Sequence, residues 1–323
     1  MKTHNYCTLF DKNYLYKGLT MYRSLEKVGA SFHLWILAMD EESYDCLDKL
    51  ELKSASLIKL KDFEDAGLRK ARTDRSRVEY CWTITPSLPL FLLKNKGLNE
   101  ITYIDADLYF YENPEPIFSE LDSRSILLIE HRYTPSQKRL EKYSGRFNVQ
   151  FMTFKNDKLT LSALEWWRAR CLEWCYHRYE DGKLGDQLYI NDWPKRFAGV
   201  HVLRNIGAGV APWNVQQYKI AEKNKKITIN NVSVIFYHFH AFRIYPKNRF
   251  DYAPGYWMPV AAKKYLYQPY TMALRRSIAE VKEVDEKWLW GYSKRENISH
   301  RIAMFVVALK KYLVDKGILK NDW

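Results

Sequence analysis

Two carboxylates two residues apart, Asp105 and Asp107, offer the most informative chemistry in this sequence. They follow a short apolar run within ITYIDADLYFY at 101–111, and residues two apart on an extended chain point the same way. Carboxylates this close repel each other unless a cation lies beside them, and their hard oxygens suit Mg²⁺ or Mn²⁺. The alternative is that Asp105 caps a turn and Asp107 is a solvated loop residue.

A second group of possible metal ligands lies in FYHFH at 236–240. His238 and His240 end an apolar strand and are expected to face one side, which favours a third metal ligand near the carboxylates. A single histidine in this place would more often be a core residue. Cys171 and Cys175 have no further Cys or His at ligand spacing, so we interpret them as core residues.

The elements that must position these groups alternate between strand and helix patterns over the first hundred residues. Apolar strands are predicted at 6–10, 32–39, 55–60 and 101–104, with helices between them. Thr85 is the expected N-cap of a helix that starts at Pro86. This order predicts an α/β fold with a mainly parallel sheet covered on both faces, in which ligands bind beyond the carboxyl ends of the strands.

The pattern is less regular beyond residue 120. Strands are predicted at 125–129, 149–154 and 232–240, a long helix at 161–179, and mostly helix over the last sixty residues. No segment rich in Pro, Gly or Ser separates these parts, so one compact α/β domain with a helical extension is the simplest interpretation.

Composition excludes several classes of protein. Among 323 residues, 47% are apolar, which excludes a disordered chain, and the five cysteines favour reduced thiols over a disulfide scaffold. The first residues show no export signal, and the longest apolar run, 302–309, is too short to span a bilayer. The net charge of +13 suits nucleic acid, an anionic membrane or a phosphorylated substrate, and composition alone leaves all three open.

Taken together, these segments resemble the nucleotide-sugar-dependent glycosyltransferases of the GT-A fold, most nearly the bacterial family 8-like enzymes. The resemblance covers about residues 3–245 and depends on the order and spacing of YCTLFDKNYLYKGLTMYRSL, RSRVEYCWTITPSL, YIDADLYFY, FNVQF, GDQ and FYHFH. It implies a mixed, mainly parallel sheet flanked by helices in a catalytic domain at 1–250. Its nucleotide-binding half would be about 1–120 and its acceptor half about 121–250, with a mostly helical extension at 251–323.

The resemblance assigns a metal site to Asp105, Asp107 and His238, with His240 in reserve because Ala241 stands where the family usually has glycine. It also implies that the nucleotide contacts Asp105 and the first strand and its loop, and that an arginine reaches the diphosphate. Asp11 and Asn13 could instead be ordinary turn residues, and the arginines a solvated helix face. The matching positions for the nucleotide are Thr8, Phe10, Asp11, Asn13 and Tyr14, and for the diphosphate Arg75 or Arg77.

The sugar would contact a second set of residues. Under the resemblance, Asp186 bonds sugar hydroxyls, Gln187 lies near the anomeric carbon, and Asn148 touches the transferred sugar or the acceptor. Gln150 stands where the family usually has a small residue. Asp186 could instead cap a helix. His131 could supply an acid or base near the acceptor, or belong to a surface loop.

The implied activity is transfer of a sugar from a nucleotide sugar, with UDP expected, to a saccharide or lipid-linked saccharide, as in bacterial surface polysaccharide or lipopolysaccharide assembly. The cofactor would be Mn²⁺ or Mg²⁺, and retention of configuration is favoured. An apolar stripe at Ile302, Phe305, Val306, Leu309 and Leu313, flanked by basic residues, predicts a helix that packs on the domain or lies on an anionic membrane.

We therefore expect a cytoplasmic protein that does not bind nucleic acid, and peripheral association with the inner face of the cytoplasmic membrane stays open. Two alternatives stay open at this stage. One is a basic nucleic-acid-binding protein, and the other is an inactive glycosyltransferase-like binding module.

Overall fold

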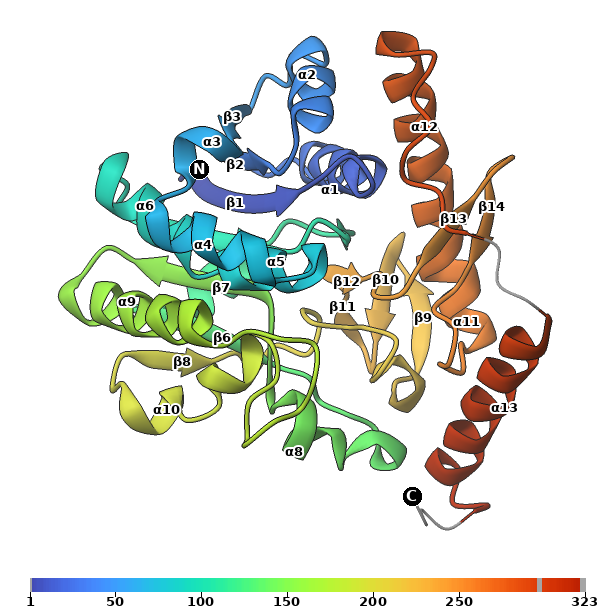
Figure 1. Ribbon diagram of the computed structural model, residues 1–323. Helices are drawn as coiled ribbons and strands as arrows, with labels where there is room; N and C mark the ends of the chain where they lie inside the picture. The colour runs from blue at the N-terminus through green and yellow to red at the C-terminus, as the bar shows by residue number, and fades with distance from the viewer. Residues whose placement is uncertain (1, 295–297, 320–323) are drawn as a thin grey trace.

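A sheet of seven strands forms the centre of the protein, with helices on both faces, in a computed structural model that describes residues 2–294 and 298–319 (Figure 1). The strand order is β3-β2-β1-β4-β7-β6-β8. β1, β2, β3 and β4 are mutually parallel, β7 runs antiparallel to both β4 and β6, and β8 is parallel to β6. The predicted mixed, mainly parallel α/β sheet is confirmed.

The first part of the chain supplies the parallel strands and their crossover helices. Its elements are β1 (His4–Phe10), α1 (Leu15–Lys27), β2 (Phe32–Ala38), α2 (Glu41–Lys49), β3 (Ala55–Lys59), α3 (Leu60–Phe63), α4 (Ala66–Asp74), α5 (Arg77–Ile84), α6 (Ser87–Asn95) and β4 (Glu100–Ile104).

The middle part completes the sheet. It contains β5 (Leu108–Phe110), α7 (Glu115–Leu121), β6 (Ile126–Glu130), η1 (Pro135–Gln137), α8 (Leu140–Ser144), β7 (Phe147–Lys155), α9 (Lys158–Glu173), η2 (Gln187–Ile190), α10 (Trp193–Arg196) and β8 (Val200–Val202).

The last part forms small sheets and the C-terminal helices. Its elements are η3 (Val215–Gln217), β9 (Ile220–Lys223), β10 (Lys226–Ile229), β11 (Val232–Ser233), β12 (Phe236–His238), β13 (Arg243–Tyr245), β14 (Arg249–Asp251), α11 (Val260–Ala262), the π-helix η4 (Lys263–Tyr267), α12 (Gln268–Val284) and α13 (Ile298–Asp315).

Two hydrophobic cores lie on the two faces of the sheet, because side chains alternate along a strand. In β1, Tyr6 and Phe10 belong to one core, and Cys7 and Leu9 to the other. The first core includes α1 and α12, and the second includes α5, α6 and α9. Cys171 lies in the second core, in agreement with its interpretation as a core residue.

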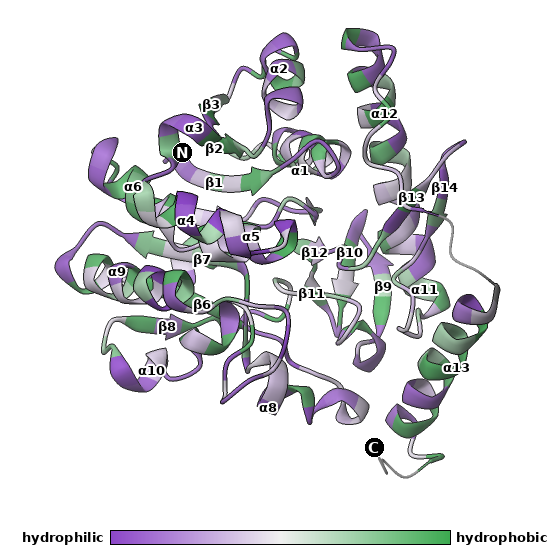
Figure 2. Cartoon of the chain, viewed as in Figure 1, coloured by the Kyte–Doolittle hydropathy of each residue, from purple (hydrophilic) through white to green (hydrophobic). Residues whose placement is uncertain are grey.

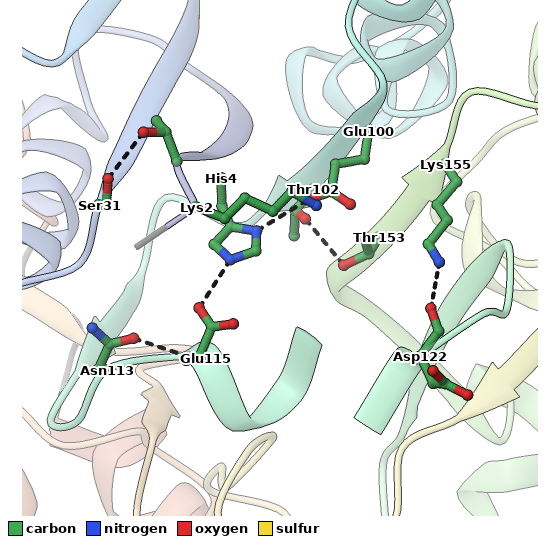
Figure 3. A network of polar contacts seen from close by, with 11 residues as sticks. Lys2, His4, Ser31, Glu100, Thr102, Asn113, Glu115, Asp122, Thr153 and Lys155 are labelled. Carbon is green, nitrogen blue, oxygen red and sulfur yellow. Dashed lines mark hydrogen bonds and ion pairs between the residues drawn. The ribbon is translucent and has the colours of Figure 1, made fainter. Parts of the chain in front are cut away.

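A buried polar network fixes the start of β1 at the end of the sheet opposite to its carboxyl edge (Figure 3). The His4 ring pairs with Glu100 at Nδ1 and with Glu115 at Nε2, each at 3.0 Å, so it links β1 to β4 and α7. Although burial opposes it, contacts with His4 and Lys2 lower the pKa of Glu100 to about 2. This ionised carboxylate therefore holds the two central strands in register.

Three local predictions are corrected. Thr85 is not an N-cap: its hydroxyl donates to the Cys81 carbonyl at the end of α5, and α6 begins at Ser87 without a side-chain cap. The segment 232–240 is two short strands, because β11 pairs with β10 while β12 turns to pair with β5. The long helix after β7 ends at Glu173 rather than at 179.

The end of the chain is mostly helical, as predicted for 251–323, although residues 295–297 and 320–323 of that extension lie outside the described residues. α13 lies at the outer edge of the molecule and alternates apolar and polar bands along its length (Figure 2). Within the described part of the chain, none of the helices combines the length and apolar character needed to span a membrane.

Candidate active site

A cavity of about 440 Å³ opens at the edge of the sheet where β1 and β4 end and β7 begins. Because β7 runs antiparallel to β4, its first residues meet the last residues of β1 and β4 at this edge. Twelve residues selected from the sequence line it: Phe10, Asp11, Tyr14, Arg77, Asp105, Asp107, His131, Asn148, Asp186, Gln187, His238 and His240. Thr8, Asn13 and Arg75 are not part of the lining.

Among the described residues, one group could hold a metal ion: Asp105, Asp107 and His238. One possible ligand atom from each lies within 4.8 Å of the other two. His238 Nε2 is 3.0 Å from an Asp107 oxygen and 3.8 Å from an Asp105 oxygen. His240 lies outside this group, with its ring centroid 5.8 Å from that of His238.

A turn, rather than strand alternation, brings the two carboxylates together. Asp105 follows β4 directly, and the Leu108 N–H donates to its carbonyl at 3.3 Å, so Asp107 lies within a turn. β5 then pairs with β12, which sets His238 opposite Leu108. The expectation that an extended chain would align the two aspartates is therefore corrected.

Gln150 fixes the orientation of the His238 ring, which the sequence alone did not indicate. Its Oε1 lies 3.0 Å from Nδ1, so Nδ1–H donates to Gln150 and Nε2 faces the carboxylates. The Trp213 ring packs edge-on against the same imidazole at 5.3 Å. An imidazole held this way presents one nitrogen as a ligand.

Lys17 adds a buried positive charge that the sequence analysis also missed. Its Nζ is 3.9 Å from an Asp107 oxygen, and only 8% of its side chain is exposed. The signal available in the sequence was a lysine in the largely apolar run LYKGLTMY at 15–22. The structure buries this part of the helix throughout. Gln150 gave a similar signal, as a polar residue in the apolar run FNVQFMTF.

The charges of this group depend on one another. Burial raises the pKa of Asp105 to about 6, and the Asp107 charge adds to this against the opposing effect of His238. Burial also acts on Asp107, but His238 and Lys17 outweigh it and hold the pKa of Asp107 below its usual range. Burial opposes protonation of His238, yet the carboxylates raise its pKa. Two carboxylates and one oriented imidazole fit Mn²⁺ or Mg²⁺.

The loop after β1 supplies one wall of the cavity. Asp11 is 3% exposed, accepts a hydrogen bond from the Asn13 N–H at 2.9 Å, and forms an ion pair with Arg77. Asn13 therefore shapes the turn without lining the cavity. Thr8 is fully buried in β1 and does not line the cavity either. Tyr14 is 41% exposed and also lines the cavity.

The structure separates the two candidate arginines. Arg77 lines the cavity at the start of α5, with 52% of its side chain exposed. Arg75 is 2% exposed, donates to the Tyr176 hydroxyl at 2.7 Å and to the Leu172 carbonyl at 3.1 Å, and stacks on the Tyr176 ring. Its guanidinium therefore joins α4 to the end of α9 and does not reach the cavity.

A hydrogen-bonded chain of side chains forms a second wall of the cavity. The Asn148 side-chain N–H₂ contacts His131 Nε2 at 2.9 Å and Gln187 Oε1 at 3.3 Å, and Gln187 donates to the Ser144 carbonyl at 2.5 Å. Burial lowers the pKa of His131 to about 3, so the ring is neutral, with Nδ1 toward the Arg146 carbonyl and Nε2 accepting from Asn148. His131 is therefore buried rather than part of a surface loop.

Asp186 lies beside this wall and is 6% exposed. It precedes η2 without making a side-chain capping bond, so the structure does not show the alternative capping role. Burial raises its pKa to about 7, and the charge of Asp105 adds to the effect. Near neutral pH this carboxyl group can both donate and accept hydrogen bonds.

Comparison with solved structures identifies the fold. The chain superimposes on the galactosyltransferase LgtC in complex with donor and acceptor sugar analogs with a TM-score of 0.53, 12% identity, and coverage of 84% of this chain and 95% of LgtC. The bifunctional glycosyltransferase WbbM gives a TM-score of 0.51 and 12% identity over 88% of this chain and 51% of its own. The expected GT-A fold of glycosyltransferases is confirmed.

Sequence relatives place the chain in a family. It is 33% identical to the Bacillus subtilis protein YfnD over 297 residues, which cover 90% of this chain and 95% of YfnD. It is 36% identical to YfnF of the same organism over 250 residues, or 75% of this chain and 82% of YfnF. The chain belongs to the family of YfnD and YfnF, both described as uncharacterized proteins. No protein-family model matches it.

Proposed function

We propose that this protein is a divalent-metal-dependent glycosyltransferase that moves a sugar from a nucleoside diphosphate sugar, with UDP-sugar as the expected donor, to a saccharide or lipid-linked saccharide. The observation that carries the proposal is the convergence of Asp105, Asp107 and His238 in the lining of a 440 Å³ cavity in a GT-A fold. Bacterial surface polysaccharide or lipopolysaccharide assembly is the kind of pathway that uses such a reaction.

The loop after β1 and the start of α5 would bind the nucleotide. Phe10 and Tyr14 supply aromatic surface for a base, and Asp11 supplies a buried carboxylate for polar edges. Arg77 is exposed enough to turn toward a diphosphate, which a guanidinium can contact through two hydrogen bonds. Without a ligand, Arg77 is paired with Asp11.

Asp105, Asp107 and His238 would hold Mn²⁺ or Mg²⁺ near that diphosphate. When bound, the ion supplies positive charge for the negative charge that develops on the leaving group. Gln150 keeps His238 Nε2 turned toward the carboxylates, and Lys17 balances part of their charge. LgtC, which shares this fold, has been solved with donor and acceptor sugar analogs, and this supports sugar ligands for the present cavity.

The second wall, formed by Asn148, His131 and Gln187 with Asp186 beside it, would orient the sugar. Asp186 can exchange hydrogen bonds with hydroxyl groups, and Gln187 and Asn148 are held in fixed orientations by their mutual bond. His131 keeps its accepting nitrogen engaged with Asn148, which supports proton transfer from the acceptor to the leaving phosphate rather than to His131. We therefore expect retention of configuration, which NMR of the product would test.

The deciding experiment is a screen of nucleoside diphosphate sugars for hydrolysis with and without Mn²⁺. The proposal expects one or a few donors to be hydrolysed only when the ion is present. Tight donor binding without any turnover would instead indicate an inactive binding module. Turnover that continues at full rate in excess EDTA would contradict the metal-dependent reaction.

A further inference from the structure

A second cavity, larger than the first, lies between α13 and the segment that follows β14. Its volume is about 630 Å³, and most of its lining is apolar or aromatic. The side chains that form its apolar wall are Phe250, Tyr252, Trp257, Met258, Met304 and Phe305. A cavity with few polar groups favours an apolar ligand over a sugar.

α13 is held firmly at one end and only loosely covers the cavity at the other. Asp315 accepts a hydrogen bond from the Ser136 N–H at 2.8 Å, and Tyr312 stacks on Trp257 at 4.6 Å. Nearer the start of the helix, Ile302 and Phe305 line the cavity while each is 59% exposed. The apolar surface therefore continues from the cavity onto the outside of α13, which lies at the edge of the molecule (Figure 1, Figure 2).

Tyr256 connects this cavity to the candidate active site, because it lines both. On the active-site side its ring centroid is 6.2 Å from that of His240. On the other side, the Lys311 ammonium lies over the same ring and donates to the Gly255 carbonyl at 3.1 Å. Tyr256 therefore lies at the boundary between the two cavities.

Charged side chains stand at the same cavity. Lys263 and Arg301 are exposed and line it, together with one acidic residue, Asp251. The two cations suit an anionic group at the boundary between a polar and an apolar part of a ligand. Together, the two neighbouring cavities offer polar side chains for a saccharide, two cations for a phosphate and apolar surface for a hydrocarbon chain.

We infer that the cavity between α13 and residues 250–258 binds the hydrocarbon chain of a lipid-phosphate-linked acceptor, whose saccharide end reaches the active site past Tyr256. This inference depends on the proposed function and specifies the acceptor class. Phe305 and Ile302 contact the chain, and Arg301 and Lys263 bind the phosphate that joins lipid to sugar.

The test is isothermal titration of the full chain with dodecyl phosphate and octyl phosphate, each below its micelle concentration. Burial of four more methylenes should tighten binding of dodecyl phosphate at least about tenfold. Phe305→Ser and Arg301→Gln should each weaken it about tenfold. The matched controls Leu289→Ser and Arg276→Gln change an exposed leucine and an exposed arginine outside the cavity and should leave binding unchanged.

Two results would overturn the inference. One is that dodecyl phosphate does not bind, or binds equally well to the Phe305 and Arg301 variants. The other is that the chain binds anionic vesicles through these residues while free dodecyl phosphate does not compete, which would assign the surface to a membrane. Donor hydrolysis by the unaltered chain is measured in parallel. Hydrolysis without lipid binding contradicts only this inference, and lipid binding without hydrolysis contradicts the proposed function.

Discussion

Gln150 Oε1 lies 3.0 Å from His238 Nδ1, so a residue in the middle of β7 sets which nitrogen of the histidine faces Asp105 and Asp107. Replacing Gln150 by Leu removes the acceptor and leaves the ring free to turn. Loss of such an orienting bond typically lowers metal affinity 10- to 100-fold, and we expect about that loss for Mn²⁺, measured by calorimetric titration.

The matched variant is Gln150→Glu, which keeps an acceptor for Nδ1–H. It should bind Mn²⁺ at least as tightly as the unaltered chain, because the carboxylate preserves the ring orientation and adds negative charge. If Gln150→Leu bound Mn²⁺ with unchanged affinity, Gln150 would have no orienting role.

Asp107 supplies the oxygen nearest to His238 Nε2, at 3.0 Å. Asp107→Asn keeps the shape of the side chain but removes the charge that a divalent ion requires. We expect Mn²⁺ binding and donor hydrolysis to be lost, while the circular dichroism spectrum stays unchanged. Asp45→Asn, at an exposed position on α2, is the control for a loss of one negative charge elsewhere. Normal hydrolysis by the Asp107 variant would exclude this carboxylate from the reaction.

Arg77 and Arg75 should respond differently to the same substitution. Arg77→Ala removes an exposed guanidinium from the cavity, so we expect nucleotide binding to weaken about tenfold with little change in stability. Arg75→Ala breaks buried, charged hydrogen bonds to Tyr176 and Leu172, so we expect about 1.5–3 kcal/mol less stability. Calorimetric titration with UDP and urea unfolding separate the two effects. Weaker UDP binding only in the Arg75 variant would reverse their roles.

The strands of the parallel half of the sheet could be predicted from the sequence because they are near-continuous apolar runs such as FHLWILAM, which becomes β2. Such strands can be recognised from the local sequence without knowledge of tertiary contacts, since a strand buried on both faces has no polar side. The division at about residues 120 and 250 into two halves and an extension stays a prediction.

The site was harder to predict where it depends on contacts between distant segments. Asp105 and Asp107 could be selected because they are close in sequence, but the contact of Gln150 with His238 joins residues 88 positions apart. Lys17 approaches Asp107 only after α1 packs beside β5. Arg75 and Arg77 are equivalent in the sequence. Tertiary contacts distinguish them, because Arg75 packs on Tyr176 while Arg77 pairs with Asp11.

His131 and Asp186 should give the stability of the protein two opposite dependences on pH. Burial lowers the pKa of His131 to about 3 from about 6.5 in an unfolded chain, so the unfolded state gains a proton first as the pH falls. This contribution to stability is present above pH 6.5 and falls by about 2 kcal/mol between pH 7.5 and 5. The pKa of Asp186 is raised to about 7, so its contribution is present at low pH and is lost as the pH rises through 7.

Because the two effects oppose each other in the unaltered chain, the variants are needed to measure each one separately. Without added divalent ions, His131→Gln should become more stable relative to the unaltered chain as the pH falls from 7.5 to 5, by about 2 kcal/mol. Asp186→Asn should become less stable relative to the unaltered chain over the same interval, because it lacks the contribution that Asp186 makes at low pH. Urea unfolding at pH 7.5, 6 and 5 measures both. Parallel pH profiles for all three proteins would mean that neither group titrates abnormally in the folded state.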